Sequence, residues 1–407
     1  MRIRNGDKPV RAVFLMMTPS VWKYDELYRL FAADGHFVPL VFVAPWTVAN
    51  GNMAIGDGSP SAGVMAMMET SLQFCQAHGY VARKAWENGR WIDLDKEWHP
   101  DLVFFSYPYD MTRAAYLQKG LKNSLSCYVT YGFNTDGQEQ RQFNLPFFNL
   151  MWRGFYETPM HVELARKFAD NGGKNVRLGG ALLFDEMRRR LREGPRSCWK
   201  TQGKKRIIWA PHHTVDDLPN ESHWCCFLQM ADPMLQLART MEGKAEFVFK
   251  PHPKLFPKLC KLPGWGEKRA REYYAAWDAL PNGQLQQGEY IDLFLTSDAM
   301  ILDCLSFMCE YMFTGNPQLF MTRDPGAIPR FNAFGDAVFR HLYHGSGMVS
   351  VVEFLDGVVF SGKDWMKSER MAFFRKTVDA VPTGASRNVF ETIIKDLGIG
   401  MVGKHEN

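Results

Sequence analysis

Short apolar runs alternate with amphipathic helical patterns along most of the chain. In the first half the runs fall at 12–17, 37–43, 102–106, 126–131 and 176–178. This alternation is typical of parallel sheets, because each parallel connection must cross back over the sheet and usually does so as a helix. The pattern restarts after residue 205, with runs at 206–210, 245–250, 299–303 and 318–322. We therefore expect an α/β chain made of two consecutive Rossmann-like domains, each with a parallel sheet.

A basic segment separates the two sets of runs and is the best candidate for a domain junction. It has Gly194-Pro195 at its centre and carries Arg188, Arg189, Arg190, Arg192, Arg196, Lys200, Lys204, Lys205 and Arg206. Such a run is commonly a solvated linker. The functional alternative is that it contacts an anionic membrane surface or an anionic polymer. We predict an acceptor domain at 1–190, a linker at 191–205, a donor-binding domain at 206–362 and C-terminal helices at 363–407.

Composition narrows the class of protein. The 407 residues are 46% apolar and 23% charged, which is typical of a globular chain and argues against disorder or an extended coiled coil. The net charge of +4 is too small to indicate nucleic acid as a partner. Eight cysteines without a CxxC spacing suggest a reducing compartment, and prolines interrupt the longest uncharged stretch, 37–56. We therefore expect a cytoplasmic protein without a spanning helix, in contact with the inner face of the membrane through the basic segment.

Polar side chains lie at the carboxyl ends of three predicted strands of the second domain, 206–210, 245–250 and 299–303. Ligands of open parallel sheets bind outside that edge, so these residues are expected to form one site. In chain order the candidates are His212, His213, Thr214, Lys250, His252, Asp303, Ser306 and Glu310.

These residue types suit the diphosphate of a nucleotide. A helix beginning near Ser306 would direct backbone N–H groups and a hydroxyl at phosphate, and Lys250 would add positive charge. His252 can donate to a phosphate oxygen or protonate a leaving group, and Glu310 is placed to accept from ribose hydroxyls. Each has a structural alternative: His252 as a turn residue, and Asp303 and Ser306 as helix caps. Their common position at strand ends favours the phosphate site.

We predict no metal and no other cofactor. Several potential ligands lie close in the sequence, namely His212, His213, Asp216, Asp217, His223, Cys225 and Cys226. However, adjacent residues rarely point at one ion, and neither CxxC nor HExxH spacing occurs. The two cysteines are expected to begin a buried helix instead.

An ordered set of motifs resembles the CDP-glycerol glycerophosphotransferase family, which includes teichoic acid polymerases and capsule or lipopolysaccharide relatives. The motifs cover about 175–322 and are Trp209-Ala-Pro-His-His, Lys250-Pro-His-Pro, Asp292-Leu-Phe-Leu-Thr-Ser-Asp, Ile301-Leu-Asp-Cys-Leu-Ser-Phe with Glu310-Tyr, and Gly315-Asn-Pro-Gln. The resemblance implies a GT-B architecture, with two Rossmann-like domains facing across a cleft. It also implies that Lys250-Pro-His-Pro and the turn from Asp303 to Ser306 hold the donor pyrophosphate, while the acceptor enters from the N-terminal domain.

The chain departs from this family at one motif. Members that polymerise glycerol phosphate carry Trp-His-Gly in the N-terminal domain, with its histidine as the proposed base. The best-matching strand end here is Thr130-Tyr-Gly-Phe133, without histidine. The base is then His212 or His213, or a carboxylate such as Asp136 or Glu157, or the donor is different.

The expected function is transfer of glycerol phosphate, or a related polyol phosphate, from a CDP-activated donor to a hydroxyl of a bacterial surface polysaccharide or its lipid-linked precursor. Catalysis is assigned to His212, His213 and His252. Three alternatives stay open: a GT-B glycosyltransferase that uses a UDP- or CMP-sugar in capsule or lipopolysaccharide synthesis, a nucleotide-sugar epimerase, and a non-catalytic scaffold. The expected partners are the nucleotide-activated donor, a glycan or lipid-linked acceptor and a membrane surface.

Overall fold

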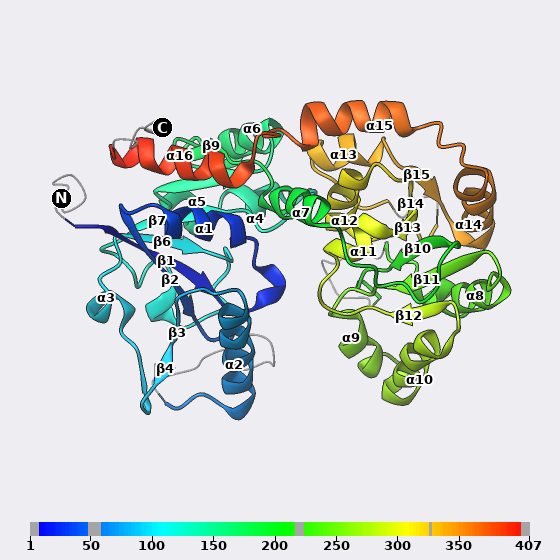
Figure 1. Cartoon of the computed structure of the whole chain (residues 1–407), viewed down its shortest axis with the longest axis horizontal. Helices are drawn as coiled ribbons and strands as arrows, with labels where there is room; N and C mark the ends of the chain where they lie inside the picture. The colour runs from blue at the N-terminus through cyan, green and yellow to red at the C-terminus, as the bar shows by residue number, and fades with distance from the viewer. Residues whose placement is uncertain (1–7, 48–57, 216–223, 325–327, 400–407) are drawn as a thin grey trace. The chain divides into compact units, whose positions relative to one another are not determined.

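The chain forms two compact units, each built on its own sheet (Figure 1). The computed structural model describes residues 8–47, 58–215, 224–324 and 328–399. The N-terminal unit comprises residues up to 132, residues 139–186 and residues from 379 onward. The C-terminal unit comprises residues 133–138 and 187–378.

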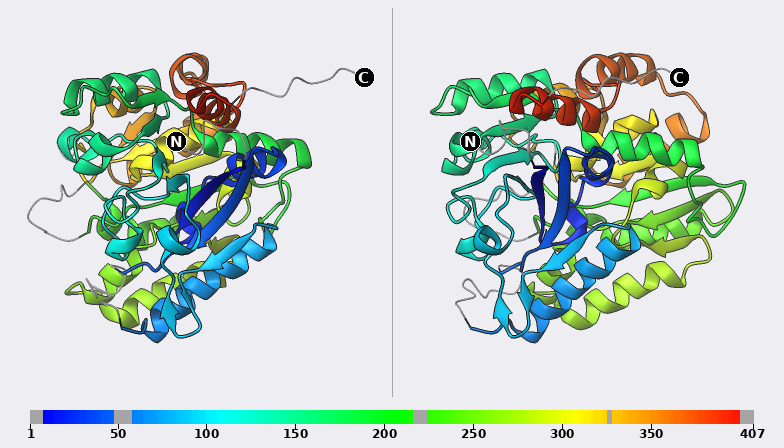
Figure 2. Two further views of the ribbon diagram at one scale, coloured as in Figure 1. Left: turned by 90° about the vertical axis from the view of Figure 1, so that its left-hand side faces the viewer. Right: turned by 60° about the vertical axis from the view of Figure 1, so that its left-hand side comes forward.

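The N-terminal unit contains a seven-stranded sheet in which all neighbouring strands are parallel. Figure 2 shows its strands β1 and β2 in dark blue. In spatial order the strands are β3 (Ala82–Lys84), β2 (Phe37–Val43), β1 (Val10–Met16), β6 (Leu102–Phe105), β7 (Leu125–Val129), β8 (Arg153–Tyr156) and β9 (Val176–Leu178). The order reverses between β1 and β6, and this switch point is where doubly wound sheets bind ligands.

The helices of this unit connect consecutive strands. They are α1 (Asp25–Ala33), α2 (Ala62–Ala77), α3 (Leu94–Glu97), α4 (Glu139–Phe143), α5 (Pro146–Leu150), α6 (Pro159–Phe168) and α7 (Leu182–Glu193), which crosses the unit boundary. Single 3-10 turns lie at Pro19–Val21 and Ala114–Tyr116, and a small antiparallel hairpin joins β4 (Trp86–Glu87) to β5 (Arg90–Trp91).

The last helix, α16 (Ala385–Leu397), belongs to the N-terminal unit although it follows the second sheet in sequence. Its Phe390 ring packs against Phe31 of α1, with ring centroids 5.0 Å apart. The carboxylate of Asp185 accepts the backbone N–H groups of Ala385 and Ser386, at 3.1 and 2.6 Å, and so caps the helix. The C-terminal residues therefore divide: 363–378 lie in the C-terminal unit, and 385–399 pack into the first core.

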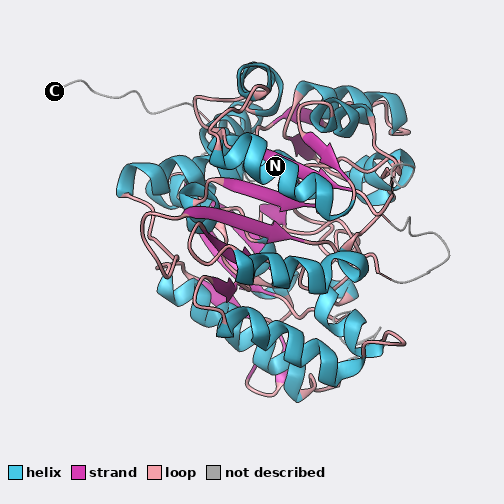
Figure 3. Ribbon diagram, turned by 90° about the vertical axis from the view of Figure 1, so that its right-hand side faces the viewer, coloured by secondary structure: helices cyan, strands magenta, loops and turns pink. Residues whose placement is uncertain are grey.

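The C-terminal unit contains a six-stranded parallel sheet. In spatial order the strands are β12 (Gly283–Leu285), β11 (Ala245–Phe249), β10 (Lys205–Ala210), β13 (Ala299–Leu302), β14 (Gln318–Met321) and β15 (Tyr343–Gly345). Strands lie between layers of helices in Figure 3. The strand order of this six-stranded sheet reverses between β10 and β13, which is its switch point. The predicted fold class, α/β with two parallel sheets, is confirmed.

The helices of the C-terminal unit follow its strands in the same way. They are α8 (Phe227–Thr240), α9 (Leu255–Lys261), α10 (Gly266–Ala279), α11 (Ile291–Thr296), α12 (Leu305–Glu310), α13 (Ala333–Phe339), α14 (Gly347–Phe354) and α15 (Lys367–Phe373). A 3-10 turn, η4 (Tyr311–Thr314), extends α12, and π-helical turns η5 (Leu355–Phe360) and η6 (Phe374–Val378) extend α14 and α15.

The basic segment is largely built into the C-terminal unit. Arg190 pairs with Asp292 at 3.0 Å, and the ammonium of Lys200 donates to the carbonyls of Asp278 and Leu280. The guanidinium of Arg206 donates to the carbonyl of Thr296 at 3.2 Å. These contacts give several of the basic side chains a structural role within the C-terminal unit. Within the described residues, none of the helices is both long enough and apolar enough to cross a bilayer.

Candidate functional site

Backbone hydrogen bonds hold two of the predicted site loops side by side at the carboxyl edge of the second sheet. Lys250 donates its N–H to the carbonyl of Trp209 at 2.8 Å, and His252 donates to that of Pro211 at 3.0 Å. On the other side of β10, Ala210 is in register with Leu302 of β13, so Asp303 emerges beside the same loop. The structure thus brings the loops after β10, β11 and β13 to one edge, at the switch point between β10 and β13.

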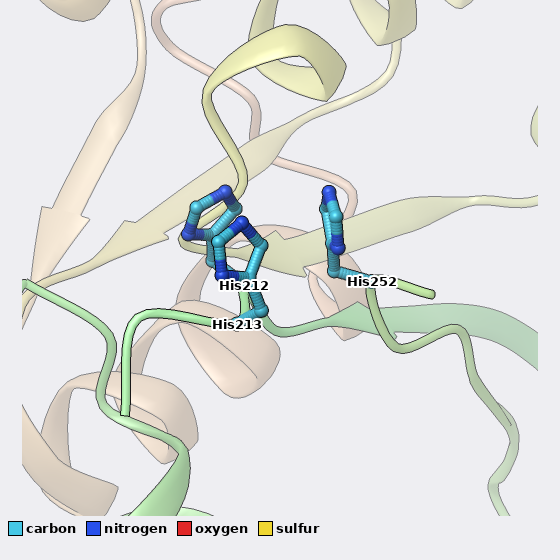
Figure 4. A group of neighbouring side chains, drawn as sticks. All are labelled: His212, His213 and His252. Atoms are coloured by element: carbon cyan, nitrogen blue, oxygen red, sulfur yellow. The ribbon is translucent and has the colours of Figure 1, made fainter. Parts of the chain in front are cut away.

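Three imidazole rings gather at this edge (Figure 4). The ring centroids of His212 and His213 are 4.2 Å apart, and those of His213 and His252 are 4.3 Å apart. One nitrogen from each ring lies within 4.8 Å of the other two. The expectation that adjacent histidines diverge is wrong here, because the strict alternation of side chains ends with β10 at Ala210.

One hydrogen bond determines the proton position on His252. The backbone N–H of Lys254 donates to its Nδ1 at 3.1 Å. In a neutral imidazole that nitrogen is then the acceptor, and the proton is on Nε2. His252 therefore presents an N–H donor from Nε2.

The charged side chains that act on the His252 ring are lysines. The pKa of His252 is lowered well below its ordinary value, mainly by burial and then by His213, Lys254, Lys250 and Lys258. Burial and the same neighbourhood also lower the pKa of His212. The His212 and His252 rings are thus neutral near pH 7, in a field that attracts anions.

Lys250 is the most buried cation of the group, with 4% of its surface exposed. Burial lowers its pKa to about 8, so the ammonium form still predominates at pH 7. Its Nζ lies 5.9 Å from the centroid of the Tyr290 ring. A buried ammonium of this kind is stabilised by an incoming phosphate, because the anion compensates for the hydration that burial has removed.

The trio fits a metal ion poorly. A ligating imidazole offers a lone pair to the metal and usually donates its other N–H to an oxygen acceptor. His252 has the reverse arrangement, since its Nδ1 lone pair already accepts from a backbone N–H. The nearby lysines would also repel a cation. The geometry and charge together suit phosphate oxygens instead.

Asp303 supports the site from below the surface. Its side chain is fully buried, and its carboxylate accepts the backbone N–H groups of His212 at 2.5 Å and Cys226 at 2.8 Å. Asp303 was predicted to be a possible helix cap, and its carboxylate does accept backbone N–H groups. These groups belong to the loop after β10 and to the N-cap residue of α8. Thr214, which is 3% exposed, lies with its Oγ1 3.3 Å from Nδ1 of His212.

Ser306 and Glu310 lie on the short helix α12, whose N-cap is Cys304. The Oγ of Ser306 lies 3.7 Å from Sγ of Cys304. Glu310, at the end of the helix, is 4% exposed and accepts a 2.6 Å hydrogen bond from the hydroxyl of Tyr290. Sequence reasoning missed Tyr290. Its position two residues before the Asp292 motif was the one available signal.

The remaining candidates are placed as follows. Asp216, Asp217 and His223 fall outside the described residues. Cys225 and Cys226 are buried, and Cys226 is the N-cap of α8, as predicted. Asp136, a candidate base, lies in the C-terminal unit, where it forms a β-bridge with Phe331. Glu157 directly follows β8 and is 1% exposed, with Oε2 3.7 Å from Nδ1 of His161.

Comparison with known proteins identifies the fold. No family model matches the sequence, and no curated protein matches it. Among solved structures, a UDP-N-acetylglucosamine 2-epimerase is similar with a TM-score of 0.63 and 14% identity, over 98% of this chain and 99% of that one. The UDP-GlcNAc 2-epimerase from Neisseria meningitidis, bound to UDP-GlcNAc, gives 0.57 and 14%, over 95% and 100%. The wall teichoic acid polymerase TagF gives 0.59 and 14%, over 97% and 90%. At this identity the likeness establishes a GT-B-type fold.

Proposed function

We propose that this protein is a GT-B enzyme that uses a nucleotide-activated donor and binds the donor's diphosphate at the carboxyl edge of the C-terminal sheet. The observation that carries the proposal is the group of Lys250, His252, His212 and His213 at the switch point of that sheet. A buried ammonium, an Nε2–H donor and further imidazoles provide charge and hydrogen bonds for two phosphates.

The reaction that we favour is transfer of glycerol phosphate, or another polyol phosphate, from a CDP-polyol. The acceptor oxygen bonds to the phosphorus of the polyol phosphate, the bond from that phosphorus to the bridging oxygen breaks, and CMP departs. The acceptor proton passes to a base, which we assign to His213 or His212. Lys250 and the Nε2–H of His252 stabilise the charge that develops on the departing phosphate. The sequence motifs at 209–213, 250–253 and 301–311, together with the likeness to TagF, support this choice.

In the donor site, Glu310 and Tyr290 are proposed to contact the ribose. The 2.6 Å hydrogen bond from the Tyr290 hydroxyl to Oε2 of Glu310 brings the two side chains together. Asp303 acts as a positioning residue, because it holds the backbone of His212. Ser306 is proposed as a further hydroxyl donor to phosphate. The acceptor is a surface glycan or its lipid-linked precursor. The exposed arginines Arg192 and Arg196 are the part of the basic segment offered for membrane contact.

The second candidate is a nucleotide-sugar epimerase. It is favoured by the likeness to a solved epimerase, which extends over 98% of this chain and 99% of that one with a TM-score of 0.63. An epimerase needs the same diphosphate site but no acceptor.

A donor panel tests both candidates. The full-length protein is incubated with CDP-glycerol, UDP-sugars and CMP-sugars, each with and without a glycan acceptor, and the nucleotides and sugars are separated by chromatography. Acceptor-dependent CMP from CDP-glycerol supports the first candidate. UDP from a UDP-sugar, or CMP from a CMP-sugar, indicates a glycosyltransferase, and an isomerised sugar without nucleotide release indicates an epimerase. A protein that binds and converts none of these donors would contradict the proposal.

A further inference from the structure

The imidazole of His212 is held by two neighbouring side chains, those of Thr214 and Trp224. Thr214 lies two residues further along the same loop and is 3% exposed, and its Oγ1 is 3.3 Å from Nδ1 of His212. Trp224 is partly buried, and its indole stacks on the imidazole with ring centroids 5.1 Å apart and 23° between the ring planes. The first contact bears on the position of the proton on His212, and the second on the orientation of its ring.

The direction of the hydrogen bond between Thr214 and His212 follows from burial. Among the residues that the structure describes, Nδ1 of His212 is the only hydrogen-bond partner of the Thr214 hydroxyl. If Nδ1 carried the proton of the neutral ring, the hydroxyl could only accept, and its own proton would stay buried without an acceptor. The hydroxyl therefore donates to Nδ1, and the proton of His212 is on Nε2.

Trp224 fixes the ring of His212 in space through Asp303. Its Nε1–H donates to the backbone carbonyl of Asp303 at 2.9 Å, while the carboxylate of Asp303 accepts the backbone N–H of His212 at 2.5 Å. The carbonyl of His212 also accepts a hydrogen bond from Sγ of Cys225 at 3.2 Å. The backbone of His212 is thus bonded at its N–H and at its carbonyl, and the stacked indole restricts rotation of the imidazole.

His212 and His252 share one tautomer as a result. In each ring Nδ1 accepts from a residue two positions further along the chain, namely the hydroxyl of Thr214 for His212 and the N–H of Lys254 for His252. The two ring centroids are 5.0 Å apart (Figure 4). Both rings therefore present an Nε2–H donor, and neither has a lone pair on Nε2 with which to take up a proton.

We propose that Thr214 and Trp224 are positioning residues that hold His212 as an Nε2–H donor at the carboxyl edge of the C-terminal sheet. The use of this donor by a phosphate rests on the proposed function, in which His212 joins His252 and Lys250 in binding the diphosphate. The base of the transfer reaction is then His213, because a neutral ring with its proton on Nε2 and its Nδ1 engaged cannot accept the proton of the acceptor hydroxyl.

The tautomer is measured directly by NMR on the full-length protein with isotope-labelled histidine, because protonated and unprotonated ring nitrogens resonate far apart. We expect the signals of His212, identified by their loss in His212→Gln, to show a protonated Nε2 and an unprotonated Nδ1 at pH 7. Thr214→Val removes the hydroxyl and should shift His212 toward the other tautomer, whereas Thr214→Ser should retain the original one. The matched control is Thr322→Val: Thr322 is 7% exposed, and its hydroxyl donates to the carbonyl of Gly345 at 3.4 Å.

The same spectra test Trp224. Trp224→Ala leaves the imidazole without its stacking partner, so the His212 signals should broaden or double. Trp224→Phe keeps an aromatic face and should retain a single set.

Calorimetry with CDP tests the use of the donor. Thr214→Val should weaken CDP binding about fivefold, since one hydrogen bond that selects the binding tautomer is lost, and Thr214→Ser should change it little. Thr322→Val should bind CDP as the unmodified protein does.

An unprotonated Nε2 on His212 in the unmodified protein, or an unchanged tautomer in Thr214→Val, would overturn the role of Thr214. A single, sharp set of His212 signals in Trp224→Ala would overturn that of Trp224. The expected tautomer in a protein that binds neither CDP nor UDP would uphold the positioning role and refute the proposed donor function. If the tautomer changes in Thr214→Val while CDP affinity does not, His212 is removed from the donor site.

Discussion

The backbone N–H of Lys254 donates to Nδ1 of His252, two residues earlier in the chain, at 3.1 Å. This contact fixes the neutral ring with its proton on Nε2. The positive charges of three nearby lysines also lower the pKa of the ring. A histidine with that tautomer is a hydrogen-bond donor for an anion. The ability of the candidate site to bind an anion therefore depends on the tautomer of His252 more than on the presence of three histidines.

Substitution of His252 tests the role of Nε2–H. His252→Gln keeps a side-chain N–H donor of similar reach, whereas His252→Asn is too short to place one there. We expect Asn to weaken CDP binding by about tenfold or more and Gln to weaken it less, since a hydrogen bond to a charged group is worth about 1.5–3 kcal/mol. Calorimetric titration with CDP measures both. Equal affinities in the two variants and the unmodified protein would remove His252 from the donor site.

The lowered pKa of Lys250 predicts that CDP binding depends on pH. Its pKa in the free protein is about 8, and only the ammonium form attracts phosphate, so CDP affinity should fall as the pH rises from 7 to 9. Lys250→Met should bind more weakly at pH 7 and lack this fall. Titrations at three pH values compare the two proteins. A fall of the same size in Lys250→Met would assign the dependence to another group.

The pKa of Lys250 also affects stability. Because the folded-state pKa lies below that of the unfolded chain, the unfolded state binds more protons between about pH 8 and 10.5. The contribution of this residue to the free energy of unfolding should therefore rise with pH across that window. Urea unfolding of the unmodified protein and Lys250→Met measures the difference, and a contribution that fell with rising pH would contradict the assignment.

Asp303 is expected to matter for folding and for site geometry together. Asp303→Asn removes one of the two oxygens that accept the N–H groups of His212 and Cys226, and should lower the free energy of unfolding by about 1–3 kcal/mol. The control is Asp232→Asn, whose side chain is 70% exposed and pairs only at the surface with Arg269. Thermal unfolding should separate the two variants. Similar melting temperatures would mean that the buried carboxylate contributes little.

A buried ion pair anchors the end of the C-terminal unit. Arg370 is fully buried, pairs with Asp364 and donates to the carbonyl of Gly315 at 3.1 Å. Asp364→Ala leaves the guanidinium without its counter-charge and should cost about 3–5 kcal/mol of stability. The double variant Asp364→Ala with Arg370→Met should recover part of that loss, because the charge itself is gone. Urea unfolding measures both, and a double variant less stable than the single one would refute this explanation.

The sequence alone located most of the longer strands. A strand in a parallel sheet is covered on both faces, so it appears in the sequence as a continuous apolar run. The predicted runs at 37–43 and 176–178 match β2 and β9, and the others agree within two residues at each end. Strand β8 was missed because Arg153 and Gly154 interrupt its apolar pattern, and the short strands β3, β12 and β15 have too few apolar residues to stand out.

For the site, the residues at strand ends were predictable because parallel strands place their carboxyl ends at one edge of a sheet. Only the tertiary structure showed that His212 and His213 both meet His252, that Asp303 holds the loop after β10, and that Tyr290 binds Glu310. It likewise decided that α16 returns to the first core, against Phe31. The reason is physical: strand formation follows from local hydrophobic pattern, whereas these contacts join side chains from separate segments, and their geometry exists only once the sheets and helices have packed.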